Sequence, residues 1–352
     1  MGDDTALAVM SKMHRQIYDY FRQQFAQVTN PPIDSLREAS VMSLETCYGP
    51  ELNVFDETPD HAKRLVTTSP VLSFKKLQSI INNKHFSNIE INLEYAKSSS
   101  LEKALKKLQE NVVKEVKNGK VIIHLVEKVP SKDYLPINAL LAVGCVHQKL
   151  VSLGLRSDAN IVISSSSARD THQIACLIGF GATAVYPSLA YQIILDLSDR
   201  NEIKGMPHEN CARYRKGVNK GLLKIISKMG ISSISSYRGS QLFEIVGLDN
   251  DVVELCFTNS ISRIAGKNFD DLDNENKKLS EYATSNLSDI SVGGLLKYVH
   301  GGEYHTYNPE IVKKLQEAVS TGSDQKYQEY ADLVDKRPPA MLRDCLLYTS
   351  DA

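Results

Sequence analysis

The sequence carries one continuous apolar run with the character of a buried strand, Val121-Ile122-Ile123-His124-Leu125-Val126. A run of this length, rich in β-branched residues, is typical of a parallel strand covered on both faces. Two more strand-like runs flank it, Ile89–Leu93 before it and Ile161–Ile163 after it. Between these runs, apolar residues recur at helical spacing over Leu101–Val116 and Ile137–Leu153. The pattern predicts strands and helices that alternate along a parallel sheet.

The same alternation continues towards the C-terminus. A helix is expected over Ala168–Ile178, then a fourth strand over Ala182–Val185, with Pro187 at the start of the next helix. A further helix over Val218–Met229 leads to a fifth short strand over Gly230–Ile234. The predicted fold class is therefore α/β, with parallel βαβ repeats that form an incomplete barrel or a doubly wound sheet.

The regions outside these repeats are less regular. Ile17, Tyr20, Phe21 and Phe25 lie at helical spacing and predict a helix over Ser11–Gln27. A long irregular segment follows, and Asp270–Ser288 is so polar that it is expected to be a surface loop. Two helices near 309–320 and 325–334 predict a helical C-terminal extension.

Composition excludes several classes of protein. The chain has 352 residues, of which 42% are hydrophobic and 24% charged, an ordinary globular balance. Lysine and arginine number 41 against 42 acidic residues, so no net field attracts nucleic acid or anionic membranes. No signal-peptide pattern and no apolar stretch of about 20 residues is present, so a soluble protein of the cell interior is expected.

The six cysteines are scattered, with no CxxC pair for zinc, redox chemistry or an iron–sulfur cluster. Cys145, Cys176 and Cys256 lie in apolar helical stretches and are expected to be buried as small hydrophobic residues. The histidines show no metal-ligand spacing, and His124 is expected to be a hydrogen-bonded core histidine. The residues themselves predict neither a catalytic nor a metal-ligating group.

One loop is a candidate binding site. Ser164–Ser167 follows the third strand, and Arg169, Asp170 and His172 come just after it. Loops at the carboxyl ends of parallel strands bind ligands in such folds, so the serines could hold a phosphate. The alternative is that they turn the chain before a helix with Asp170 in its first turn. His172 lacks an identified nucleophile to act on.

Two other patterns favour structural roles. Gly179 is expected to cap the helix that precedes the fourth strand, because Gly179-Phe180-Gly181 matches no nucleotide-binding motif. A stripe of three lysines is expected to be a solvated helix face: Lys216, Lys220 and Lys224.

Three groups of sequence motifs resemble the central domain of the glutamate synthase large chain. The first group begins with FAQVTNPPID over 25–34 and continues with Val41-Met42-Ser43-Leu44-Glu45-Thr46. It also includes two short proline-containing motifs, around Pro59 and Pro70. The second is VNKGLLK over 218–224 with Ser236-Tyr237-Arg238-Gly239. The third is Gly301-Gly302-Glu303-Tyr304-His305 with Arg337-Pro338-Pro339, similar to the passage into the flavin-binding domain. Together they cover nearly the whole chain in order.

The resemblance implies a fragment of an oxidoreductase that converts glutamine, 2-oxoglutarate and reductant into two glutamates. Its central domain joins an amidotransferase domain to an FMN synthase domain and lines an ammonia channel. FMN and a [3Fe-4S] cluster belong to the full-length enzyme, and this fragment is expected to bind neither fully and to be inactive alone. Ferredoxin or a pyridine-nucleotide-oxidising small subunit would supply electrons, in the cytoplasm or a plastid. Neither nucleic acid nor membrane is an expected partner.

The resemblance also implies an organisation and one site residue. Residues 1–75 are expected to form the N-terminal helix and an extended interdomain segment. Residues 76–290 are expected to form the central α/β domain, and residues 291–352 a truncated start of the FMN domain. Met42 is expected to pack near the flavin or 2-oxoglutarate, whereas Arg238 and Gly239 are expected to be structural. Leu125-Val126-Glu127-Lys128 and the residues from Cys345 to Ala352 depart from the family pattern, and the latter suggest a truncated or wrongly joined reading frame. The alternative is a free-standing, non-catalytic module that binds a phosphorylated metabolite at the Ser164–Ser167 loop.

Overall fold

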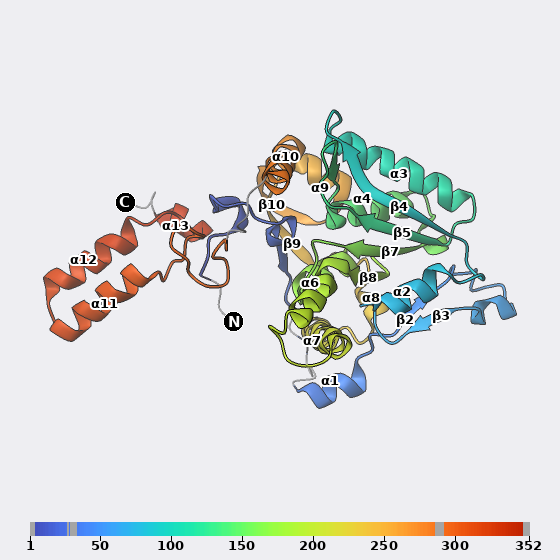
Figure 1. Cartoon of the computed structure of the whole chain (residues 1–352), viewed down its shortest axis with the longest axis horizontal. Helices are drawn as coiled ribbons and strands as arrows, with labels where there is room; N and C mark the ends of the chain where they lie inside the picture. Colours follow the sequence, from blue (N-terminus) through green and yellow to red (C-terminus); the bar gives the residue numbers. More distant parts are fainter. Residues whose placement is uncertain (1–3, 27, 29–33, 286–291, 348–352) are drawn as a thin grey trace. The chain divides into compact units, whose positions relative to one another are not determined.

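A computed structural model describes residues 4–26, 28, 34–285 and 292–347. The chain folds into two compact units, one formed by Met1–Tyr20 with Asn286–Ala352 and the other by Phe21–Ser285. Figure 1 shows the elements of each unit along the chain. No helix within the described residues is long and apolar enough to cross a membrane.

A five-stranded sheet forms the centre of the unit Phe21–Ser285. Its order is β6 (Tyr134–Pro136), β4 (Asn88–Ala96), β5 (Ile122–Glu127), β7 (Asn160–Ser165) and β8 (Ala184–Pro187). Strands β4, β5, β7 and β8 are parallel, and β6 pairs with β4 in the antiparallel sense. The first four of the five predicted strands are confirmed. Every residue of β7 is buried, which explains its continuous apolar run.

Helices follow each of the parallel strands, as the sequence predicts (Figure 1). They are α3 (Leu101–Lys117), α4 (Ala139–Ser152), α5 (Thr171–Gly179), α6 (Ser188–Asp199) and α7 (Pro207–Lys228). Helix α3 packs on α4, α4 packs on α5, and α6 lies beside α7. Cys145 in α4 and Cys176 in α5 are buried, as is Cys256 at the end of α9 (Asn250–Cys256). The expectation for these three thiols is therefore confirmed.

The sheet remains open and does not close into a barrel. At the β8 edge, Val185 donates its N–H to Pro70 O at 2.8 Å, and Leu72 N donates to Val185 O at 2.9 Å. A separate sheet contains β1 (Phe21–Gln23), β9 (Phe243–Leu248) and β10 (Ile261–Lys267). The fold is α/β with an incomplete, barrel-like parallel sheet.

An aromatic cluster fills the core beside the second sheet. Phe21, Phe180, Phe243 and Phe257 are fully buried, with ring centroids between 4.8 and 6.3 Å apart. Gly179 is the last helical residue of α5, and a Cβ there would stand 2.7 Å from the Phe243 ring. The expectation that Gly179 caps the helix was wrong, because Gly181 takes the positive φ of +117°. Gly179 instead makes room for the ring.

The remaining elements of this unit are short except for α10. They are α1 (Ser35–Val41), β2 (Thr46–Tyr48), η3 (Pro59–Ala62), β3 (Leu65–Thr67), α2 (Phe74–Ile81), η4 (Arg156–Asp158), α8 (Ile234–Tyr237) and α10 (Phe269–Thr284). Strands β2 and β3 form a two-stranded antiparallel sheet.

Three predictions about the flanking regions were wrong. In place of a helix over Ser11–Gln27, the chain forms a short 3₁₀ turn over Ile17–Tyr20 and then β1, which pairs with β9; Gln27 lies outside the described residues. In place of a loop over Asp270–Ser288, helix α10 runs to Thr284 from a capping box; 286–288 lie outside the described residues. Gly230–Ile234 is no strand, since only Ser233 makes an isolated bridge and Ile234 begins α8.

The second unit is largely helical. Helix α11 (Pro309–Thr321) and helix α12 (Asp324–Asp335) pack together as a hairpin, and α13 (Leu342–Leu347) follows (Figure 1). Gly322 turns the chain between α11 and α12 with φ +58°. The N-terminal segment adds a 3₁₀ turn, η1 (Ala8–Met10). The predicted helical C-terminal extension is confirmed.

Candidate functional site

Met42 lies at the C-terminal end of α1. The helix begins at Asp34, whose carboxylate accepts from the N–H groups of two residues in the first turn. Met42 is half-buried, has extended backbone angles and donates its N–H to Glu38 O at 3.0 Å. Two apolar side chains of α1 remain open to solvent, with Leu36 82% and Val41 55% exposed.

The segment after Met42 is held against the loop before α8. Ser43 N donates to Ser232 O at 2.7 Å, and Ile234 N donates to Ser43 O at 2.9 Å. Glu38, which is buried, also pairs with Lys224 Nζ at 3.5 Å from helix α7. The segment around Met42 and the segment 218–224, which belong to two of the three motif groups that carry the family resemblance, therefore lie side by side in space.

The Ser164–Ser167 loop is occupied by a side chain of the same unit. Glu127, at the carboxyl end of β5, is only 8% exposed and accepts from the Ser166 and Ser167 N–H groups at 2.7 and 2.9 Å. The Ser165 and Ser167 hydroxyls donate to the same carboxylate at 2.8 and 2.9 Å. Ala139 N, at the start of α4, donates to its other oxygen at 2.9 Å. These donors would suit a bound anion, but the Glu127 carboxylate already satisfies them.

Residues after the loop have structural roles. Asp170 is the N-cap of α5 and forms a capping box with Gln173, one position before the first turn in which it was expected. His172 lies beside the Cys176 thiol at 3.7 Å and edge-on to the Phe243 ring. The turn-and-cap interpretation of this region is thus closer to the structure than phosphate binding.

His124 is a core histidine, as predicted. Its Nε2 lies 2.7 Å from Ser164 Oγ, and its Nδ1 lies 3.2 Å from a Glu90 carboxylate oxygen. Burial lowers the pKa of His124, although the Glu90 charge opposes the shift. The lysine stripe of α7 lies on the solvent side of the helix, as expected for a solvated face.

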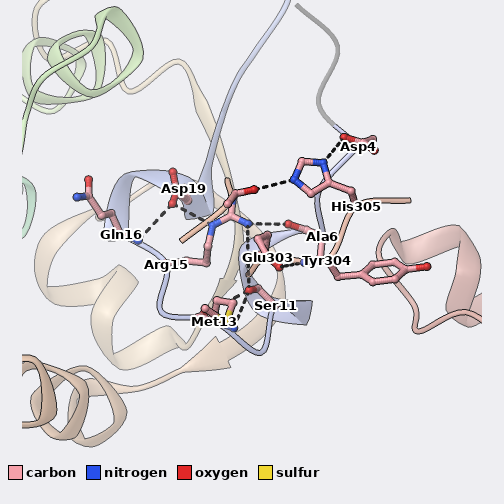
Figure 2. Close-up of polar contacts among 11 residues, drawn as sticks. Asp4, Ala6, Ser11, Met13, Arg15, Gln16, Asp19, Glu303, Tyr304 and His305 are labelled. Carbon is pink, nitrogen blue, oxygen red and sulfur yellow. Dashed lines mark hydrogen bonds and ion pairs between the residues drawn. The ribbon is translucent and has the colours of Figure 1, made fainter. Parts of the chain in front are cut away.

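The unit formed by the two chain ends contains a buried ion-pair cluster (Figure 2). Arg15 and Glu303 have side chains that are 5% and 3% exposed, and Arg15 Nη1 lies 3.2 Å from Glu303 Oε2. Arg15 also donates to Asp19 at 3.1 Å and to Ala6 O at 3.0 Å, and Ser11 Oγ donates to Glu303 at 2.7 Å. The cluster attaches the N-terminal segment to the segment Gly301–His305.

His305 makes a second attachment in the same unit (Figure 2). Its Nδ1 lies 2.8 Å from an Asp4 carboxylate oxygen, and its Nε2 lies 2.7 Å from Gly294 O. Both neighbours are acceptors, so only the doubly protonated imidazolium donates to both. Burial alone would raise the pKa of Asp4, but the Tyr307 N–H and His305 lower it overall. Sequence spacing missed these contacts because the partners lie about 300 residues apart in the chain.

The residues present do not fit the cofactors that the resemblance implies. An iron–sulfur cluster needs several cysteine thiolates together. Across 4–26, 28, 34–285 and 292–347, no three histidine, cysteine or acidic side chains gather as metal ligands. A flavin phosphate needs free N–H donors at the carboxyl ends of strands, and those of the serine loop bind Glu127. Within the described residues, no group of metal-ligating side chains is available to a cluster, and the donors of the Ser164–Ser167 loop are not free for a flavin phosphate.

Comparison with known proteins assigns the family. A protein-family model described as "Glutamate synthase central domain" matches residues 1–249. The chain is 39% identical to the chloroplastic ferredoxin-dependent glutamate synthase of Spinacia oleracea, covering 100% of this chain and 23% of the relative. It is 36% identical to the glutamate synthase [NADPH] large chain of Azospirillum brasilense, covering 98% of this chain and 23% of that one.

Among solved structures, the recombinant flavin-binding domain of baker's yeast flavocytochrome b2 is similar to this chain. The match covers 63% of this chain and 47% of that one at 14% identity, with a TM-score of 0.35. The chain spans about a quarter of the length of the curated relatives it matches. The family match covers most of the chain, and the relatives align along nearly all of it. The protein therefore belongs to the glutamate synthase family, and its residues 1–249 correspond to the central domain of that family.

Proposed function

We propose that this chain serves as the central domain of a glutamate synthase large chain, joining an amidotransferase domain to an FMN synthase domain. The observation that carries the proposal is the central-domain match over 1–249, together with the glutamate synthases that align along nearly the whole chain. In the whole enzyme, glutamine, 2-oxoglutarate, two electrons and two protons yield two glutamates. The chain itself supplies no catalytic group to this reaction.

The other parts of the enzyme hold the cofactors in this proposal. FMN transfers the electrons to the substrate and a [3Fe-4S] cluster feeds them in, both bound outside this chain. Relatives named ferredoxin-dependent and NADPH-type make ferredoxin or a pyridine-nucleotide-oxidising small subunit the candidate electron donors. The chloroplastic names of plant relatives support a plastid as an alternative to the cytoplasm.

Met42 is proposed to shape the synthase site, with its thioether packed against the flavin or 2-oxoglutarate and no role in proton transfer. Its half-buried position supports this, as do the exposed Leu36 and Val41 side chains of the same helix. Apolar side chains left open on one short helix are suited to being covered by a neighbouring domain. The segment from Thr29 to Ser73 is proposed as a wall of the ammonia channel.

A chimaeric enzyme tests the proposal. This chain replaces the matching segment of a ferredoxin-dependent relative, and glutamate formation is measured with glutamine and, separately, with ammonium. We expect both activities to survive and glutamine to be used without release of free ammonia. An insoluble or inactive chimaera in several junction designs, or an active one that releases the ammonia, would contradict the proposed role.

Within the chimaera, Met42→Ala tests the site residue. We expect a KM for 2-oxoglutarate that rises several-fold, because packing around the substrate is lost. Val41→Ala is the matched control, since it removes an apolar side chain of the same helix beside Met42. Equal effects of the two variants would assign Met42 to domain contact only.

A further inference from the structure

A polar cavity of about 220 Å³ lies in the unit Phe21–Ser285, and the proposed function assigns it no ligand. It sits between the segment after Met42 and the loop before α8, near the amino ends of β7 and β8. Hydroxyl, amide and charged groups dominate its lining, including Cys47, Glu51, Arg64, Asn160, Thr183 and Arg238.

Arg238 brings an unused guanidinium to this cavity. Its side chain is only 21% exposed, and the nearest carboxylate oxygen, Glu51 Oε1, is 3.7 Å from Nη2, beyond hydrogen-bond distance. The Arg238 backbone N–H binds Ile234 O at 3.0 Å, so the main chain is fixed. The guanidinium itself has five N–H donors and makes no hydrogen bond to any residue in the described part of the chain.

The surroundings of Arg238 carry an excess of positive charge. Arg64 also lines the cavity and makes one long hydrogen bond, 3.5 Å to Gly49 O. Arg156 lies close behind, with its guanidinium bound to a histidine and two carbonyl oxygens. Burial and the charge of Arg238 lower the pKa of Arg156 to about 10. Two acidic residues that line the cavity, Glu45 and Glu51, oppose this excess only partly, because both are exposed, Glu51 with 58% of its side chain.

We propose that this cavity binds a small oxyanion, a carboxylate or a phosphate group, through the Arg238 guanidinium with support from Arg64. A guanidinium fork binds either group through two parallel N–H···O bonds. Glu51 competes for Arg238 and turns towards solvent when the ligand enters. Hydroxyl groups on the cavity wall, such as that of Thr183, donate to the remaining oxygens. The site does not depend on the proposed function, and it gives Arg238 a role beyond the structural one expected from sequence.

Calorimetric titration of the full chain tests the site. The probes are 2-oxoglutarate, glutamate and inorganic phosphate, each at constant ionic strength. We expect saturable binding of at least one probe with a Kd on the order of 1 mM. Arg238→Gln should weaken it roughly tenfold or more, because charge-assisted hydrogen bonds are lost. Glu51→Gln should tighten it several-fold, since the competing carboxylate is gone.

Arg263→Gln is the matched control. Arg263 also has a carboxylate at 3.7 Å, that of Glu244, but its side chain is 75% exposed and it does not line this cavity. It should leave the Kd unchanged. If Arg238→Gln does not fold, Arg238→Lys replaces it. We expect Arg238→Lys to bind the probe more weakly than the native chain, because lysine lacks the planar guanidinium that makes two parallel hydrogen bonds.

The probes separate the two sources of oxyanion. Binding of phosphate alone supports a phosphorylated ligand, and binding of the acids alone supports a metabolite carboxylate. The proposal is overturned if no probe binds saturably below about 50 mM to either the native chain or Glu51→Gln. It is equally overturned if Arg263→Gln weakens binding as much as Arg238→Gln does.

Discussion

Glu127→Ala removes the acceptor that five donor groups share. Three of them are backbone N–H groups, those of Ala139, Ser166 and Ser167, which cannot turn to another partner. The two hydroxyls, on Ser165 and Ser167, can rotate towards each other, since they already lie 3.3 Å apart. The substitution therefore leaves mainly the backbone donors without an acceptor.

The cost follows from those three donors. A buried N–H without an acceptor costs about 1–3 kcal/mol, and water entering the vacated space recovers part of it. We expect the free energy of unfolding of this unit to fall by about 3–5 kcal/mol. At about 2–4 °C per kcal/mol, as for a domain of this size, that corresponds to a melting temperature lower by about 6–20 °C. Glu127→Gln should cost less, about 2–3 kcal/mol, because one carbonyl oxygen still accepts.

Thermal unfolding followed by circular dichroism measures the loss, and formate provides a second reading. Added formate should raise the melting temperature of Glu127→Ala but not that of the native chain, because only the variant has empty donors. Glu110→Ala is the control, an exposed acidic residue of α3 that makes no ion pair with any described residue. It should change stability by less than about 0.5 kcal/mol. A Glu127→Ala variant that melts within about 2 °C of the native chain would refute the account, as would equal formate effects.

Four further predictions concern other parts of the chain. Gly179→Ala should destabilise it by about 1–2 kcal/mol in denaturant unfolding, because the new Cβ meets the Phe243 ring. Gly217→Ala, in a helix with open space around it, should stabilise by about 0.5–1 kcal/mol. Asp4→Asn should cost about 1 kcal/mol at pH 7. Because the pKa of Asp4 is lowered in the folded protein, its contribution to the free energy of unfolding is complete above the ordinary aspartate pKa. That contribution disappears as the pH falls through the pKa of Asp4 in the folded protein, so the stabilities of the native chain and the variant should converge in acid. A thiol reagent should modify two cysteines of the native chain quickly and three others only after unfolding, namely Cys47 and Cys345 against Cys145, Cys176 and Cys256.

The parallel sheet could be predicted because its two central strands are buried on both faces. Residues of β5 and β7 have apolar neighbours on each side, so their sequence is apolar without alternation. Helix α3 was equally clear, with buried residues at helical spacing from Leu101 to Val116. In these elements the local pattern and the tertiary environment agree.

The elements that sequence reasoning missed depend on distant partners. Strand β1 has only three residues, and its conformation comes from pairing Phe21 with Ile245. Helix α10 is polar because most of its residues are exposed, and it also buries a polar side chain. Asp273 accepts from the Tyr95 hydroxyl at 2.5 Å and pairs with Lys277 at 2.7 Å. A composition rule that equates polarity with loops fails where a buried polar group has its partner on another element.

The serine loop and the Arg238 cavity are opposite cases of one rule. A cluster of donors needs an anion, and a ligand supplies it only when no side chain does. In parallel pairing, Val126 lies opposite Ser164, and the Ser165 hydroxyl donates to Glu127, the next residue of β5, at 2.8 Å. At Arg238 the nearest carboxylate is mostly exposed and out of hydrogen-bond range, so donor capacity remains there for a ligand.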